Sequence, residues 1–268
     1  MKIRIGFEQV YEFPQPTPMI LTLNVHASRA EDLVQPDHIA SSPEVHLHGY
    51  HDSYGNWWNQ LLAPQDRLTL TVDTEIYDTG APDPLVPPSW QHNVELLPTD
   101  TLLFLLPSRF CEVDLLMPVA WELFSKLPAG QPLVQAICDY VHELIRFDYM
   151  RARVTMTALE VYREKTGVCR DYTHLAITFC RCMNIPARYC TGYLSDIGMP
   201  PPYGTMDFAA WFEVYLGDQW HMFDVRNNKP CHGRVLIARG RDAADVALSS
   251  TFGPNMMTGF RVWADEVV

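Results

Sequence analysis

A cysteine lies at the start of a predicted helix, where its thiol could act as a nucleophile. Cys169 opens a run of helical character that continues to Cys182 and ends near Asn184. The positive end of a helix dipole lowers the pKa of a thiol in the first turn and favours the thiolate, and Gly167 allows a sharp entry turn. Because buried apolar cysteines are more common than reactive ones, this placement alone does not establish catalysis.

A second group with possible chemistry is a set of histidines near the N-terminus. His46, His48 and His51 precede Asp52, and imidazoles two residues apart share one face of a strand, so a metal site is conceivable. However, Pro43 stands before them, a turn follows, and no soft fourth ligand stands at the expected spacing. We therefore expect neither a metal site nor any other cofactor.

Two further pairs have a functional and a structural interpretation. Trp57 and Trp58 could form a carbohydrate or partner surface, but an aromatic pair beside a turn is more often a small satellite core. Arg170 and Asp171 could form an ion pair in an active site, but an acidic residue in the first turn is favoured by the helix dipole. We expect the structural role for both pairs.

Helices are predicted first, then strands, around the cysteine. Apolar residues recur at helical spacing over residues 115–127, 133–147 and 158–165, ahead of the helix at 169–182. Short aromatic and β-branched runs follow at 187–194, 209–216 and 220–225, with Gly217-Asp218 as a hairpin turn between the last two. Helices followed by an antiparallel sheet predict an α+β fold.

The first 80 residues read as a separate β region. Alternating Ile3, Ile5 and Phe7 and the runs 20–25 and 68–73 predict strands, with a turn signal at 52–56. The simplest closure is a small β-sandwich over residues 1–80. Residues 81–100 contain five prolines and little periodicity, which indicates a connector. Residues 101–268 are then predicted to form the core domain.

Four separated segments resemble one family in order, spacing and residue type. They are the runs 167–176, 184–193, 207–215 and 220–224. Together they resemble the bacterial transglutaminase-like proteins, often described as candidate cysteine proteases. The β region at 1–80 and the run 106–111 resemble the N-terminal domain and connector of that family. The resemblance implies a papain-like, transglutaminase-like core with a Cys-His-Asp triad.

Carried over by position, the resemblance makes Cys169 the nucleophile and Asp224 the residue that orients the imidazole. The family histidine is expected within Asp-Phe-His-Ala-Trp, but this sequence has Ala209 at that position. An alanine can neither accept nor return a proton. The triad is therefore incomplete as the sequence stands.

Three other histidines could replace the missing base. His221 is expected to face away from Asp224, because neighbours in a strand alternate in direction. His174 lies five residues beyond Cys169, about 140° around the helix at ~100° per residue. His232 falls in a predicted loop whose direction the sequence does not define, so it stays open as a candidate.

Three explanations of Ala209 remain: a natural degenerate member that keeps the cleft for binding, an enzyme with an unusual base, or an engineered replacement of histidine. The resemblance implies a cysteine hydrolase or acyltransferase that acts on peptide or amide bonds through a thioester, impaired by the loss of the base. The alternative is a catalytically degenerate module that binds a peptide or protein. The sequence does not decide whether the chain is an enzyme.

Composition limits the partners. The 268 residues carry a formal charge of −12 with a pI near 5.2, which argues against nucleic acid or an anionic membrane as a partner. Seven cysteines, an odd number without paired CxxC spacing, indicate reduced thiols. The N-terminus shows no signal-peptide pattern, and no stretch approaches ~18 apolar residues, so we expect a cytoplasmic protein. The sequence carries no signal for an oligomeric state.

Overall fold

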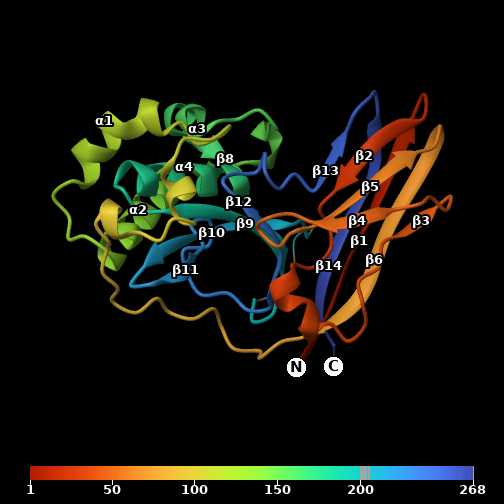
Figure 1. Cartoon of the computed structure of the whole chain (residues 1–268), viewed down its shortest axis with the longest axis horizontal. Helices are drawn as coiled ribbons and strands as arrows, with labels where there is room; N and C mark the ends of the chain where they lie inside the picture. The colour runs from red at the N-terminus through yellow and green to blue at the C-terminus, as the bar shows by residue number, and fades with distance from the viewer. Residues whose placement is uncertain (200–203, 205, 268) are drawn as a thin grey trace.

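A computed structural model describes residues 1–199, 204 and 206–267. It has an α+β architecture in which a β-sandwich packs beside a mixed helix and sheet core (Figure 1). The predicted fold class is confirmed. Within the described residues, no helix is both long and apolar enough to cross a membrane.

The sandwich is built from two antiparallel four-stranded sheets. The first has the order β14-β1-β6-β3, formed by Met256–Val267, Lys2–Phe13, Asp66–Tyr77 and Ala40–Ser42. The second has the order β13-β2-β5-β4, formed by Ser249–Thr251, Thr17–Leu21, Trp57–Ala63 and His48–His51. Alternate residues of β1 and β6 are buried, as expected for strands with one face against a core.

The C-terminus returns to the N-terminal sandwich. β14 pairs with β1 along its length, from Lys2 opposite Val267 to Glu12 opposite Met256, and the two chain ends lie side by side (Figure 1). The assignment of all residues 101–268 to the core is therefore corrected: the strands within 249–267 belong to the sandwich sheets. The sheet to which these strands belong depends on main-chain pairing between distant segments. The alternation of apolar residues along a strand does not specify its partner.

Within the described residues, the core combines four helices with a third four-stranded antiparallel sheet. The helices are α1, α2, α3 and α4, which span Val113–Phe124, Gln131–Leu144, Ala158–Glu164 and Cys169–Cys182. The sheet has the order β11-β10-β9-β12, formed by Gln219–Phe223, Ala209–Leu216, Ala187–Leu194 and Arg234–Gly240. The hairpin between β10 and β11 turns at Gly217 and Asp218, both at positive φ, as predicted.

Helix α4 occupies the centre of the core. It packs against α1, α2 and α3 and against β9 and β10, and every residue from Asp171 to Cys182 is buried. A helix covered on all sides has little freedom to shift, so it is a rigid platform for whatever its first residue does.

Short segments complete the chain. The strands β7 and β8, Arg146–Phe147 and Thr166–Gly167, pair in parallel just before α4. Single 3₁₀ turns, η1 to η4, span Ala27–Asp32, Val94–Leu96, Leu102–Leu105 and Tyr149–Arg151.

Candidate active site

The first turn of α4 is fixed by a side-chain cap. The Asp171 carboxylate accepts a hydrogen bond of 2.9 Å from the main-chain N–H of Val168, which stands just before the helix. Gly167 leaves room for this cap, because a Cβ there would lie 2.7 Å from Asp171 Cβ. Arg170 pairs with Asp171 at 3.1 Å and donates to the Arg153 carbonyl. The capping role predicted for the Arg170–Asp171 pair is confirmed, and it sets the position of Cys169.

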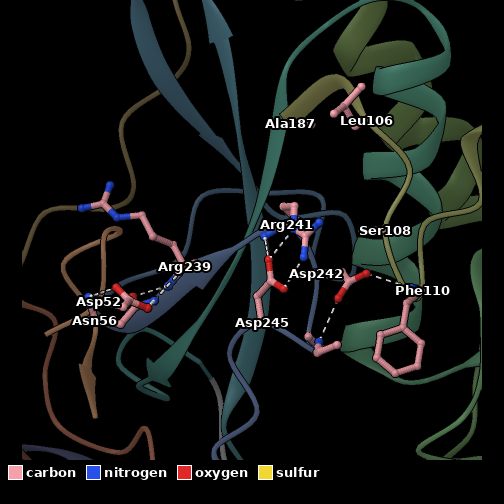
Figure 2. A network of polar contacts seen from close by, with 12 residues as sticks. Asp52, Asn56, Leu106, Ser108, Phe110, Ala187, Arg239, Arg241, Asp242 and Asp245 are labelled. Carbon is pink, nitrogen blue, oxygen red and sulfur yellow. Dashed lines mark hydrogen bonds and ion pairs between the residues drawn. The ribbon is translucent and has the colours of Figure 1, made fainter. Parts of the chain in front are cut away.

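A buried arginine holds the far end of α4 in place. Arg181 donates to three main-chain carbonyls from three different segments, those of Ala187, Leu106 and Arg241. The adjacent Asp242 carboxylate accepts from the main-chain N–H of Phe110 at 2.7 Å (Figure 2). These contacts join the segment 106–110, helix α4 and the residues after β12. The helix that carries Cys169 is therefore anchored at both ends.

The Cys169 thiol is partly exposed, and its surroundings raise its pKa. Its sulfur lies 3.9 Å from the Phe208 carbonyl, to which the thiol donates. Burial and the nearby Asp207 carboxylate raise the pKa of Cys169 to about 11, against the opposing effect of the main-chain N–H groups of Ala210 and Arg170. The placement at a helix start predicted a lowered pKa. The pKa shift is in the opposite direction, because burial and a neighbouring negative charge outweigh the helix end.

The three triad positions meet in one pocket. Cys169, Ala209 and Asp224 all line a pocket of about 130 Å³ at the junction of α4 with β10 and the end of β11. The side chains of Cys169 and Asp224 therefore face a common space. Ala209, at the position where the family pattern has a histidine, contributes only a methyl group to the pocket.

Asp224 is already occupied by other partners. Its side chain is 5% exposed, and Oδ2 accepts from Arg234 Nη2 at 2.8 Å and from the Asn227 side chain at 2.8 Å. Among the described residues, Oδ1 accepts only from the main-chain N–H of Asn227, at 2.9 Å. A carboxylate oxygen has room for about two donors, so Oδ1 keeps one acceptor position.

The alternative histidines lie elsewhere. His221 contacts Ser89, with 3.4 Å between Nε2 and Oγ. His232 points Nδ1 at the Gly80 carbonyl, 3.2 Å away. All ten histidines belong to the described residues, and none lines the Cys169 pocket. Neither of these two side chains supplies the missing base.

His174 is part of the packed core. Its ring is fully buried, stacks on Phe110 at 5.0 Å and contacts Tyr189 at 5.1 Å. Nε2 accepts from the main-chain N–H of Ala243 at 3.1 Å, and burial lowers the pKa of His174 well below its ordinary value. The imidazole is therefore neutral and faces away from Cys169, as its position on the helix predicted.

Two pocket residues escaped the sequence analysis. Asp207 and Tyr149 line the same pocket as Cys169. Burial raises the pKa of Asp207, and burial followed by the charge of Asp207 raises the pKa of Tyr149. The sequence could have indicated Asp207, because it stands two residues before Ala209 in the family-like segment 207–215. Tyr149 lies in a 3₁₀ turn outside all four segments.

The N-terminal histidines and tryptophans have structural partners. Trp58 is buried and donates to Asp52 at 2.9 Å, and Trp57 contacts the His51 ring edge-on at 4.5 Å. The packing role predicted for this pair holds for Trp58, whereas Trp57 lines an open cavity of about 770 Å³ together with His46 and His51. In the part of the chain that the structure describes, no three His, Cys, Asp or Glu side chains are arranged to hold a metal ion.

Comparison with known proteins assigns this fold and site to a class. A model of the transglutaminase-like superfamily matches residues 122–225, the segment that contains all three triad positions. A candidate cysteine protease from Cytophaga hutchinsonii has a solved structure that superimposes with a TM-score of 0.83, at 30% sequence identity over 98% of this chain and 90% of that chain.

Curated relatives extend over most of the chain. An uncharacterized protein of Mycobacterium leprae is 22% identical over 244 residues, covering 89% of this chain and 87% of that protein. One from Mycobacterium tuberculosis is 29% identical over 221 residues, covering 73% and 68%. The chain belongs to the transglutaminase-like superfamily, as the sequence resemblance predicted.

Proposed function

We propose that this protein binds an extended peptide or amide-containing segment of a protein in its transglutaminase-like cleft, and that chemistry at Cys169 is impaired. The observation that supports this proposal is the composition of the pocket. Cys169, Ala209 and Asp224 line it together, and none of the ten histidines does. A neutral thiol with a pKa of about 11 and no imidazole beside it has little thiolate at neutral pH.

A second candidate function is cysteine-dependent hydrolysis or acyl transfer with Asp207 as the base. The interaction between Asp207 and Cys169 favours this candidate. After burial, the charge of Asp207 has the largest effect on the pKa of Cys169. A carboxylate with a raised pKa is a better proton acceptor than an ordinary one. Cys169 would then lose its proton to Asp207 and attack the amide carbonyl. The proton would pass to the departing amine, and water or a second amine would release the thioester.

The cytoplasm is the location we propose for this activity. All seven cysteines are free thiols, as is usual in a reducing compartment.

A peptide-display experiment separates binding from catalysis. A library of random hexapeptides is selected on the wild-type protein, and the recovered peptides are tested on Cys169→Ala and Ala209→Trp. We expect equal binding by wild type and Cys169→Ala and loss of binding by Ala209→Trp, whose indole would fill the pocket. Ala129→Trp, at an exposed position outside the pocket, is the matched control and should bind normally.

Mass spectrometry of the bound peptides gives the second readout. Intact peptides after overnight incubation support the binding proposal. Peptides cleaved by the wild type, or attached to Cys169, would replace it with the hydrolase or acyltransferase. If Ala209→Trp binds as the wild type does, the cleft is not the binding site.

A further inference from the structure

A second polar pocket lies between the sandwich and the core. It has a volume of about 320 Å³ and shares no lining residue with the Cys169 pocket. Its lining includes three arginines, Arg29 from η1 and Arg234 and Arg239 from the two ends of β12. Guanidinium groups are strong, directional donors to oxyanions, so the hydrogen-bond balance of this pocket indicates what it can bind.

Arg234 has one donor group without an acceptor. Its side chain is 5% exposed, Nη2 donates to Asp83 at 2.9 Å and to Asp224 at 2.8 Å, and the guanidinium lies 4.6 Å from the centre of the Trp211 ring. Nη1 is buried and has no hydrogen-bond partner among the described residues. A buried charged donor left unpaired costs more free energy than an ordinary lost hydrogen bond, so an acceptor at this position would be stabilising.

The acceptors near Arg239 are distant or shared. Its Nη2 lies 3.4 Å from His26 Nδ1, whose lone pair already accepts from Ser28. Arg239 Nε lies 3.3 Å from His26 Nε2, but that nitrogen lies 2.9 Å from the Tyr54 carbonyl, to which it can only donate. His26 Nδ1 meanwhile accepts from the main-chain N–H of Ser28 at 3.0 Å. A neutral imidazole has one N–H and one lone pair, so His26 Nε2 cannot also accept from Arg239. Burial lowers the pKa of His26, which keeps the ring neutral.

The three acidic residues of the lining already have partners. Asp78 accepts from the main-chain N–H of Gly80 at 2.8 Å and lies 3.7 Å from Arg29. Glu213 accepts from Arg188 Nε at 2.6 Å and lies 3.7 Å from the Arg239 guanidinium. Two arginines thus share one carboxylate, and burial together with Arg188 lowers the pKa of Arg239. Asp83 already pairs with Arg234 and accepts from the main-chain N–H of Cys231 at 3.0 Å.

The direction of the Arg239 side chain is consistent with a role in the pocket. Its main-chain N–H is held by the Asn56 side chain at 2.9 Å, and the guanidinium extends away from Asn56 and Asp52 (Figure 2). The backbone is therefore anchored by the sandwich, while the charged group is left for the pocket.

We propose that this pocket is a binding site for a small oxyanion, in which Arg239 and the free Nη1 of Arg234 donate to its oxygens. A carboxylate or a phosphate has the acceptors that these two groups lack, and a planar guanidinium can bind either with two parallel hydrogen bonds. The volume accommodates a small organic acid or inorganic phosphate. The site shares no lining residue with the Cys169 pocket, but the two are linked by the contact of Arg234 with Asp224.

Calorimetric titration of the full-length protein tests the site. Sodium succinate and sodium phosphate are titrated separately at constant ionic strength, with sodium chloride as the blank. We expect saturable binding of at least one of the two anions by the wild type and at least tenfold weaker binding by Arg239→Gln. Arg241→Gln is the matched control, because Arg241 lies just beyond β12, pairs with Asp245 and does not line the pocket.

Arg239→Lys covers the case in which the glutamine variant does not fold. Lysine keeps the charge but loses the planar fork, so affinity should still fall. Binding of succinate alone identifies a carboxylate site, and binding of phosphate alone identifies a phosphate site. The proposal is overturned if the wild type binds neither anion, or if the folded Arg239 variants bind as tightly as Arg241→Gln.

Discussion

Restoring a histidine at position 209 should activate the Cys169 thiol. A pKa of about 11 in place of the ordinary 9.0 means about 100-fold less thiolate at neutral pH. In Ala209→His the imidazole would enter the pocket that Cys169 and Asp224 share, and Asp224 Oδ1 has one acceptor position left for it. An imidazolium beside the thiolate would lower the thiol pKa.

We expect alkylation of Cys169 at pH 7.5 to be about 10- to 100-fold faster. A fall of about one to two units in the thiol pKa raises the thiolate fraction tenfold per unit. Iodoacetamide labelling followed by mass spectrometry of the Cys169 peptide measures the rate, with the partly exposed Cys231 as an internal reference. Ala209→Asn has a similar size without a base and should label as slowly as the wild type. A folded histidine variant with the wild-type rate would refute the placement of position 209 beside the sulfur.

Three further changes test how the site is supported. Gly167→Ala should lower the free energy of unfolding by about 1–3 kcal/mol, because its Cβ meets the Asp171 cap at 2.7 Å, whereas Gly204→Ala at an exposed position should have little effect; urea titration compares them. Arg181→Met should lower the free energy of unfolding, measured by urea titration, by about 3 kcal/mol or more, since three carbonyls lose their donor. His174 is held neutral in the folded protein, so protonation of the unfolded chain should reduce stability as the pH falls below about 6.5. His174→Gln should reduce the slope of the unfolding free energy against pH by at most about 1.4 kcal/mol per pH unit. An unchanged slope would contradict a neutral, buried His174.

Local patterns predicted much of the core. The start of α4 at Cys169, the strands β9, β10 and β11 and the turn at Gly217 follow from short-range signals in the chain, whereas the strand β12 at Arg234–Gly240 was not predicted. The same is true of the position of Cys169 and Asp224 in one pocket, which the spacing of the four family segments implied.

Long-range contacts could not be predicted in this way. The pairing of β14 with β1 joins the two ends of the chain, and nothing in the alternation of residues 256–267 distinguishes the sandwich from the core sheet. The contact of Arg234 with Asp224 depends on how β12 folds back beside β9. The raised pKa of Cys169 depends on burial and on Asp207, which the position in the helix does not reveal.

The pH dependence of Cys169 alkylation in the wild-type protein tests the central claim most directly. The account predicts a rate that stays low through neutral pH and rises toward a midpoint of about 11. A midpoint clearly below about 8.5, the pKa of a free thiol, would show an activated cysteine and would contradict an impaired site.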